Sequence, residues 1–537
     1  MYHVECIDIH KDHPLFGYLD RACLCSNNMR NVANFYIRNL MTGLGKDPSV
    51  RTENEVGVIQ TVYTAVPQIN AVLREKCELK ARHIREDTAL SDKDRERKLK
   101  DLRCAQFNVP DAQHWFASYS LLDAVFKFTD NPDYRSFHSH VIQNAIRDCC
   151  ESWMSYFKSL RTYSPSSAHT GKPRIPGYKK SGGRSTAVFS NIACSIKHQR
   201  LFFPKCDVEG STGTKRPSLD VSALPRSSKE KLIEVRAVPY YGIYRIQIVT
   251  DDGLKEEDLL PKENDIIGTD GRPAGVMMMD LGLENFAAIA DNRGNDPIVI
   301  KGGALKARNQ WSSKRIAFLT SELMKGHDAK TYHPPETKQI QSIRRKRDNI
   351  MRDTFYKTAH FICRTMRQRG LDYLIVGHSP GAKQGIDIGH KNNQAFVQIP
   401  YGKFISILQT VCVKYSVRLI LQEESYTSKA CFGKRDHIPA YGEDDNRLVS
   451  FSGERIKRGV YLQDDGKLIN ADINAAVNIG RKYDERIFPE DDDCEYLYGT
   501  VLSVTVRDVL RASQEYHRRK SDPGQTGQRA SVCPVSA

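Results

Sequence analysis

The sequence predicts a multidomain protein of the α+β class, in which a helical part, a small all-β part and an α/β part follow one another. The chain has 537 residues, enough for roughly two to four domains of ordinary size. Apolar residues recur at helical spacing up to residue 164, and short strand-like runs separated by turn residues follow from 165 to 262. From 274 to 483 buried strands alternate with helices, which is typical of a sheet with parallel strands.

The charge balance points to a polyanionic partner. Lysine and arginine outnumber aspartate and glutamate by 80 to 65, so the formal net charge is +15. Nucleic acid is the commonest partner for such an excess, and an acidic membrane surface is the competing explanation. Apolar residues make up 40% of the chain, so it can bury cores and is not disordered as a whole.

No membrane span or export signal is expected. We find no run of about 18 apolar residues, and the N-terminus, MYHVECIDIHKDHP, lacks the apolar centre of a signal peptide. We therefore expect a cytoplasmic protein, or a nuclear one if the source is eukaryotic.

The cysteines predict reduced thiols rather than a metal or disulfide framework. The chain has 14 cysteines, and none of them forms a C-x-x-C pair. A zinc ribbon needs two such pairs to close a tetrahedral site, so no zinc is expected. Cys23 and Cys25 form a C-x-C without a second pair. The scattered pattern favours reduced, mostly buried thiols.

The N-terminal half is predicted to be helical after one short strand. Residues 1–20 fit a strand and a loop, and helical spacing covers Asp20 to Leu44 and residues 55–164. Within it, Lys80 to Arg103 is strongly charged, which favours a solvated helix hairpin over a specific binding surface.

A Gly/Pro-rich segment then separates the helices from a set of strands. The segment SPSSAHTGKPRIPGYKKSGGRS excludes a regular helix, because its prolines and glycines break helical hydrogen bonding. The runs that follow predict a small barrel or sandwich at 165–262, which can include the N-terminal strand. These runs are TAVFSNIACSI, RLFFP, KLIEVRAV and YYGIYRIQIVT.

The C-terminal half is predicted to be an α/β domain after a linker at 263–273. VMMMD reads as a buried strand with FAAIA as its hairpin partner, and residues 304–326 and 340–369 read as helices. Two further strands are expected, LDYLIV and VRLILQ, with an amphipathic helix from Phe404 to Cys412 between them. This order implies a parallel strand pair joined by a crossover helix. We expect residues 484–537 to be a tail with one helix near 500–519 and a disordered end.

Three acidic positions stand at strand ends or a helix start. Asp280 ends the first buried strand, Glu423 or Glu424 follows VRLILQ, and Asp472 precedes the helix of INAAVNI. Each has an ordinary explanation: a turn cap, a solvated strand tip and a helix cap. Together, such carboxylates can hold two magnesium ions, which polarise a phosphate and activate water. Hydrolysis of a nucleic-acid backbone can use that chemistry.

At this point the motifs resemble a known family. Residues 275–482 resemble the RuvC nuclease domain of the TnpB proteins, the transposon-encoded RNA-guided nucleases related to miniature type V CRISPR effectors. The N-terminal half agrees more loosely, through HPLFGYLDRACLCSNNMRNVANFYIR and GKPRIPGYKK. The matching pieces are DLGLENFAAIAD at 280–291, QIPYGKFISIL at 398–408, EESYTSKA at 423–430, FSGERIKRGVY at 451–461 and INADINAAVNI at 469–479.

The resemblance implies a domain plan and partners. It implies a wedge β-barrel from residues 1–20 and 165–262, a helical recognition domain at 21–164, and a split RuvC nuclease domain with an RNase H-like fold at 274–483. It also implies a guide RNA, a double-stranded DNA target with a flanking motif read by the protein, and one or two chains per RNA. Cleavage would use Mg²⁺ at Asp280, Glu424 and Asp472, in the cytoplasm at the nucleoid of a prokaryote.

The sequence departs from the family at two places. The second carboxylate commonly ends the strand corresponding to LDYLIV, where this chain has Gly377 and His378. Some relatives carry it one strand later, and Glu424 fits that position better than Glu423 because it stands two residues before Tyr426. His378 as a metal ligand is a lesser alternative. Many relatives also insert zinc-binding C-x-x-C pairs, where this chain keeps only Cys431 and is expected to form a metal-free loop at 430–460.

Basic and aromatic residues in three segments are candidates for nucleic-acid contact, with solvation as the alternative for each. Tyr36 and Arg38 in the first helix could face the flanking duplex, although Tyr36 could equally be a core residue. The candidates are Arg344, Arg345, Lys346 and Arg347 in IRRKR; Lys172, Arg174, Tyr178, Lys179 and Lys180 in the Pro/Gly-rich segment; and Lys429, Arg455, Lys457 and Arg458 between the second and third acidic positions.

Three functions remain open from the sequence. The first is an RNA-guided DNA endonuclease. The second is a nuclease-inactive, RNA-guided repressor of the same family, which Gly377 favours and the retained carboxylates oppose. The third is a transposase that uses the acidic triad without RNA.

Overall fold

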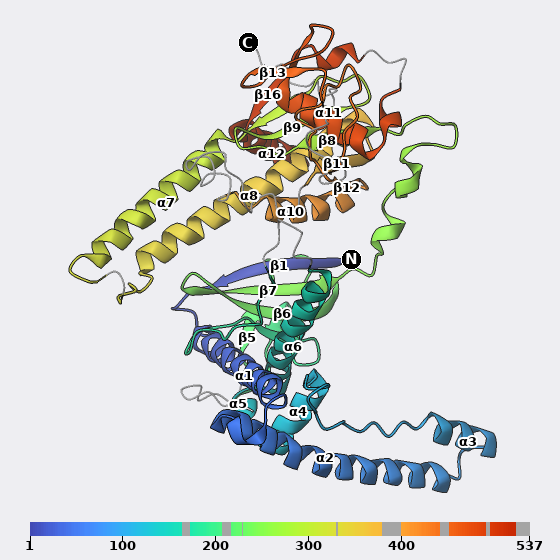
Figure 1. Ribbon diagram of the computed structural model, residues 1–537, viewed down its shortest axis with the longest axis vertical. Helices are drawn as coiled ribbons and strands as arrows, with labels where there is room; N and C mark the ends of the chain where they lie inside the picture. Colours follow the sequence, from blue (N-terminus) through green and yellow to red (C-terminus); the bar gives the residue numbers. More distant parts are fainter. Residues whose placement is uncertain are drawn as a thin grey trace. The chain divides into compact units, whose positions relative to one another are not determined.

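The computed structural model describes residues 1–163, 172–206, 216–227, 229–328, 331–378, 399–440, 450–489 and 494–521, with side chains up to 514. The chain divides into two compact units, Met1–Leu254 and Lys255–Ala537. Figure 1 shows the helices and strands of both.

The first unit is built on a four-stranded antiparallel sheet in the order β1-β7-β6-β2. Its strands are β1 (Tyr2–Ile9), β2 (Ala187–Ser190), β6 (Lys231–Tyr240) and β7 (Ile243–Asp251). The N-terminal strand therefore joins the later strands, as the sequence allowed. A second sheet holds β3 (Ser195–Lys197), β4 (Arg200–Phe202) and β5 (Ser218–Asp220). The described strands thus form two separate sheets, and no closed barrel is seen among them.

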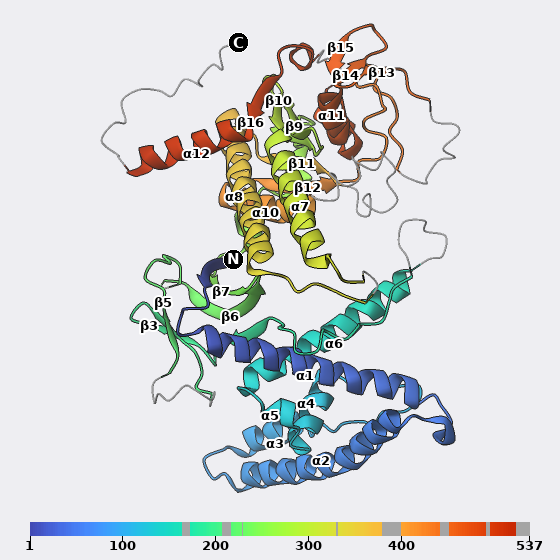
Figure 2. The ribbon, with the colours of Figure 1, turned by 90° about the vertical axis from the view of Figure 1, so that its left-hand side faces the viewer.

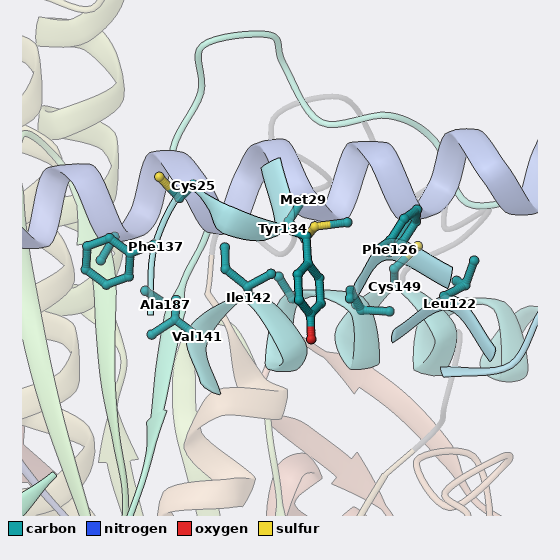
Figure 3. Close-up of a cluster of buried hydrophobic side chains, with 14 of the residues drawn as sticks. Cys25, Met29, Leu122, Phe126, Tyr134, Phe137, Val141, Ile142, Cys149 and Ala187 are labelled. Carbon is teal, nitrogen blue, oxygen red and sulfur yellow. The ribbon is translucent and has the colours of Figure 1, made fainter. Parts of the chain in front are cut away.

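Helices cover this sheet and share one core with it. Leu19, Met29 and Ile37 of α1 are fully buried, as are Ile142 and Cys149 of α6. Figure 3 shows that core, where side chains from α1 and α6 meet Phe126, Tyr134 and Ala187. The helices are α1 (Phe16–Gly43), α2 (Glu53–Glu86), α3 (Asp92–Asp101), α4 (Tyr119–Phe128), α5 (Pro132–Arg135) and α6 (Ser139–Thr162).

The charged hairpin is solvated, as predicted, but the two cysteines that flank it are joined. α3 buries none of its residues, whereas α2 begins at a capping box between Thr52 and Glu55 and buries its first half. Cys77 and Cys104 form a disulfide, which the prediction of reduced thiols had missed because nothing in their spacing signals a pair. Eleven other described cysteines are free, most of them buried.

The same helix α2 is the one described helix that is long and apolar enough to cross a membrane. A core helix of a soluble protein passes that test equally well, and Val58, Val62 and Val66 of α2 are buried in the unit's core.

The second unit is built on a six-stranded sheet in the order β12-β11-β8-β9-β10-β16. The strands β8, β11 and β12 run parallel, and β9 runs antiparallel to β8 as its hairpin partner. The parallel pair β11 and β12, joined through α10, confirms the predicted crossover. The strands are β8 (Val276–Asp280), β9 (Asn285–Asp291), β10 (Ile298–Lys301), β11 (Tyr373–Gly377), β12 (Arg418–Gln422) and β16 (Leu502–Thr505).

Helices lie on both faces of this sheet because alternate residues of β8 point to opposite sides. Met277 and Met279 pack with residues of α8 and α10, while Val276 and Met278 pack with residues of α11. Figure 2 shows α7 and α8 running beside each other. The helices are α7 (Gly303–Met324), α8 (Lys338–Arg369), α10 (Tyr401–Lys414), α11 (Ala471–Tyr483) and α12 (Val506–Ser521).

The last part of the chain differs from the predicted tail. β16 pairs in parallel with β10, and α12 packs on α8, so residues 502–521 belong to the second unit. The predicted disordered end, 522–537, lies outside the described residues, as does 441–449 of the predicted metal-free loop.

Short elements complete the two units. A three-stranded sheet beside α11 holds β13 (Glu454–Lys457), β14 (Val460–Leu462) and β15 (Leu468–Asn470). The predicted linker contains a 3₁₀ turn and buries Ile266. The 3₁₀ turns are Pro48–Val50, Glu256–Asp258, Glu263–Ile266, Glu485–Ile487 and Glu495–Leu497.

Candidate active site

Asp280 stands at the end of the central strand β8, where a tight turn leads into β9. A Cβ at Gly282 would lie 2.8 Å from the carbonyl oxygen of Asn285, so the turn needs glycine there. The hydroxyl of Tyr401 donates to the carbonyl oxygen of Gly282 at 2.7 Å and holds the turn against α10. Because β8, β11 and β12 are parallel, their carboxyl ends meet at this edge of the sheet.

Glu424 reaches the same edge from two residues beyond β12. The last residue of β11, Gly377, lies opposite Gln422, the last residue of β12. A Cβ built on Gly377 would lie 2.6 Å from Oε2 of Glu424. The carboxylate of Glu424 therefore lies directly over Gly377, the position at which the resemblance implied a carboxylate.

Asp472 lies in the first turn of α11 rather than at its cap. Asn470 is the N-cap and accepts from the backbone amides of Asp472 and Ile473. The predicted capping role of Asp472 is therefore wrong, and its side chain is left for other contacts. It accepts a hydrogen bond from Nδ2 of Asn285 at 2.6 Å.

The three carboxylates sit close enough to influence one another. Burial, Glu424 and Asp472 together raise the pKa of Asp280 to about 8, against a smaller opposing effect of Arg455 and the Leu281 amide. In the described residues no group of three or more His, Cys, Asp or Glu side chains is drawn together tightly enough to hold a metal ion as it stands. The arrangement is thus a converging cluster of negative charge that a divalent cation would neutralise.

Glu423, the alternative to Glu424, is engaged elsewhere. Its carboxylate accepts from Nζ of Lys482 and from the amide of Ser425. Partial burial works to raise the pKa of Glu423, but the hydrogen bonds from Lys482 and Ser425 outweigh it and lower that pKa. The local geometry therefore favours Glu424 as the member of the cluster. His378 continues the β11 ladder through its amide, which donates to the carbonyl of Gln422 at 2.8 Å.

Basic residues border the cluster on the side of β13. Arg455 lies 3.6 Å from Asp472, and Arg458 lies 3.2 Å from Glu284. Lys429 and the exposed Lys457 complete the predicted set. An open pocket of about 400 Å³ lies here, lined by Ser428, Lys429, Phe451, Gly453, Glu454, Arg455 and Tyr461.

The IRRKR segment is partly used for internal contacts. Arg344 pairs with Glu336 at 2.6 Å, and Nε of Arg347 donates to Asn309 of α7 at 2.8 Å. Lys346 is exposed. Arg344 and Arg347 thus have partners within the same unit, and the contact of this segment with nucleic acid stays a prediction.

The segment around Cys431 is held by buried amides. The Cys431 thiol donates to Oε1 of Gln463 at 2.9 Å, and Gln463 donates to Asn474 of α11 at 3.0 Å. Asn474 and Asn478 both donate to the carbonyl of Ala430. The spacing of these amides and of Asn285 in the sequence does not mark them as site residues, although Asn285, Asn474 and Asn478 lie in the motifs that resemble the family.

Two parts of the second unit match known families. Residues 270–381 match the family described as probable transposase OrfB_IS605, and residues 401–479 match the TNB domain of Cas12f1-like proteins. No curated protein matches the chain.

Solved structures similar to this chain include nucleic-acid complexes of CRISPR effectors. A Cas12f1–sgRNA–target DNA complex has 12% identity and a TM-score of 0.28, over 89% of this chain and 98% of that one. Alicyclobacillus acidoterrestris C2c1 with single-guide RNA has 10% identity and a TM-score of 0.28, over 81% of this chain and 70% of that one. At such TM-scores the likeness decides nothing about the fold. In these two stretches the chain is similar to the OrfB_IS605 family and to the Cas12f1-like TNB domain, which is consistent with the resemblance to TnpB proteins in this part of the chain.

Proposed function

We propose that the protein is an RNA-guided DNA endonuclease that hydrolyses phosphodiester bonds with Mg²⁺ at Asp280, Glu424 and Asp472. The observation that carries the proposal is the convergence of three carboxylates from β8, the end of β12 and α11 at one sheet edge. They come from positions far apart in sequence, so their meeting is a property of the fold.

The residues fit a divalent cation. A half-buried carboxyl whose pKa is raised to about 8 beside two further carboxylates marks a site that lacks positive charge. Carboxylate oxygens are the ligands that Mg²⁺ takes in proteins. When bound, Mg²⁺ would polarise the phosphate and lower the pKa of water at this edge.

The surrounding side chains have separate tasks in this proposal. Asn285 orients the carboxylate of Asp472, and Gly377 leaves room for that of Glu424. Lys429 and Arg455, on the pocket beside the cluster, would hold the phosphates of the strand to be cut. The strands β11 and β12 are neighbours in the sheet, so the carboxylate of Glu424 after β12 can lie where a side chain at residue 377 of β11 would lie. This arrangement supports the proposed RNase H-like fold.

The guide RNA and the duplex DNA target are proposed from the TnpB-like and Cas12f1-like matches and from the net charge of +15. We also propose a wedge domain from residues 1–20 and 165–262, a recognition domain at 21–164 and a RuvC nuclease domain at 274–483. The domain and partner assignments rest on the resemblance.

The test is plasmid cleavage by the full chain, purified with co-expressed RNA from its own locus. Asp280→Ala should abolish Mg²⁺-dependent cleavage while the protein still co-purifies with RNA. Asp465→Ala, which removes a carboxylate from the exposed turn between β14 and β15, is the matched control and should cut normally. Wild-type cleavage by Asp280→Ala would contradict the site assignment.

A transposase remains the second candidate, favoured by the description of the family that residues 270–381 match. It predicts a protein that carries no RNA and joins DNA ends in the absence of any guide. The repressor hypothesis loses its main support, because Gly377 lies beneath the carboxylate of Glu424. Sequencing of co-purified RNA, together with a strand-transfer assay, separates these functions.

A further inference from the structure

The segment that follows α3 runs back along α2 and is fastened to it at three points (Figure 1). On α2 the fastening residues stand seven positions apart, which places them on one side of the helix. They are Tyr63, Asn70 and Cys77, and their partners are Pro110, Phe107 and Cys104. Seven helical residues rise about 10.5 Å and three extended residues span about 10 Å, so the two pieces of chain stay in register.

The two fastenings nearest the core are hydrogen bonds. The hydroxyl of Tyr63 donates to the carbonyl of Pro110 at 2.9 Å. Nδ2 of Asn70 donates to the carbonyl of Phe107 at 2.8 Å, and its Oδ1 accepts from the amide of the same residue at 2.8 Å. Pro110 is buried and Phe107 packs against the core of the first unit, so these contacts do not depend on the state of the cysteines.

Beyond these hydrogen bonds, the disulfide between Cys77 and Cys104 closes the hairpin. We call residues 78–103 the arm; all of them are described, and none is buried. The ion pairs of α3 lie within that helix. Among the described hydrogen bonds and ion pairs, none joins residues 78–86 of α2 to α3 or to the segment after it, so the disulfide is the tie at the base of the arm.

The two sulfurs differ in their access to solvent. Cys104 is exposed, whereas Cys77 is 8% exposed. Thiol–disulfide exchange begins with the attack of a thiolate on an accessible sulfur, and exposed disulfides are the ones that exchange readily. Cys363 and Cys412 are the contrary case, because their sulfurs lie 3.6 Å apart in the core of the second unit and both are buried, free thiols.

We propose that Cys77 and Cys104 form a reversible redox latch that decides whether the arm is fixed to the first unit. In the oxidised state the bond closes the base of the arm and restricts its conformations. In the reduced state the arm keeps no buried residue to hold it, so it should open from its base as far as Phe107, where Asn70 still holds the chain. The proposal does not depend on the carboxylate cluster.

The oxidant in this proposal is a small-molecule disulfide such as oxidised glutathione. The thiolate of Cys104 attacks one of its sulfurs, which forms a mixed disulfide and releases one small thiol. The thiolate of Cys77 then attacks Sγ of Cys104, which forms the protein disulfide and releases the second small thiol. The two protein thiols give up two protons and two electrons in all, and the small disulfide becomes two thiols.

The equilibrium test places the full chain in glutathione buffers that range from fully reduced to fully oxidised. The reaction is stopped with acid, free thiols are alkylated, and mass spectrometry measures the oxidised fraction of the pair. Cys77 and Cys104 should pass from thiols to disulfide within this range, in either direction of approach, while Cys363 and Cys412 stay reduced.

The latch test measures trypsin cleavage of the arm, which carries nine lysines and arginines. Cleavage should be about tenfold faster in the reduced state than in the oxidised state, because the reduced arm opens more often. Cys104→Ser should be cut at the fast rate in every buffer. Cys6→Ser, which removes a half-buried cysteine of β1 in the same unit, is the matched control and should respond like the wild type.

The order of attack is tested with single variants. Cys77→Ser keeps the exposed Cys104 and should accumulate the mixed disulfide with glutathione, whereas Cys104→Ser should form one at Cys77 severalfold more slowly. An equal or faster reaction at Cys77 overturns the assigned order.

The remaining outcomes decide the latch itself. A pair that stays oxidised in fully reduced glutathione is a permanent structural bond, and a pair that stays reduced in fully oxidised glutathione forms no latch. Either result overturns the proposal. Equal trypsin rates in the two states overturn the control of the arm, and a reversible pair with different rates supports it.

Discussion

At the residue scale, the absence of a side chain at Gly377 decides where the carboxylate of Glu424 can lie. Its missing side chain leaves the space that Oε2 of Glu424 occupies, and the methyl end of Ile479 closes the other side, 2.6 Å from a Cβ placed there. A side chain at residue 377 would therefore collide with the carboxylate of Glu424 in its present position.

Gly377→Ala should lower cleavage by roughly tenfold or more without unfolding the protein, because the flexible carboxylate of Glu424 must move away from the new methyl group. Cleavage rates at saturating Mg²⁺ measure the effect. Gly402→Ala in α10, where a Cβ meets nothing within 4 Å, is the matched control. Equal rates for both variants would show that Glu424 does not act from this position.

Glu424→Gln and Glu423→Gln should have different effects, although the residues are adjacent. Glu424→Gln removes a charge from the carboxylate cluster and should abolish cutting. Glu423→Gln weakens the contact with Lys482, so it should slow cutting only a few-fold and lower stability slightly. Paired cleavage and melting measurements decide, and an inactive but stable Glu423→Gln variant would reverse the assignment.

At the element scale, α11 organises the segment after β12. Asn478 donates to the carbonyls of Thr427 and Ala430 at 3.0 and 2.7 Å, in a site that is fully buried. Side-chain amides of α11 therefore hold this segment beside the carboxylate cluster.

Asn478→Ala should destabilise the second unit by about 1–3 kcal/mol, because the carbonyl of Thr427 loses its side-chain donor, whereas that of Ala430 keeps Asn474. Chemical denaturation measures this loss. Gln310→Ala on α7 removes an exposed helical amide and should change stability little. A zinc-selective chelator should leave wild-type stability unchanged, and a large destabilisation by the chelator would contradict amide support.

The elements missed from the sequence share a physical cause. β10, β13 to β16 and β5 have three or four residues each, too short for alternation to stand out. The strands β8, β9, β11 and β12 and helices α7, α8 and α10 were predicted within a few residues, because their apolar patterns are long or uninterrupted.

At the scale of the whole molecule, the two units have separate cores. One core joins helices of the first unit to β2, β6 and β7, and the other two lie on opposite faces of the six-stranded sheet. A ligand of the carboxylate cluster should therefore stabilise only the unit that contains it.

Calorimetry should show that Mg²⁺ raises the unfolding temperature of the second unit and leaves that of the first unchanged. In EDTA, Asp280→Asn should unfold at a higher temperature than wild type, since it removes a carboxyl group whose ionised form is disfavoured by burial and then by Glu424 and Asp472. The rise should be roughly 2–4 °C for each kcal/mol of that cost removed. The variant should also lose the Mg²⁺ response, and an unchanged response would place the metal elsewhere.

The sequence by itself determined the three acidic positions, the parallel strand pair and the basic segment 172–180, because strand ends, periodicity and composition are local properties. The tertiary structure decided which glutamate joins the cluster, since Lys482 holds Glu423 while Gly377 leaves space for Glu424. It also brought Asn285 into contact with Asp472, and Asn31 of α1 into contact with Lys179 of the basic segment. All of these contacts join residues that are distant in the sequence, and only the packed fold sets their distance.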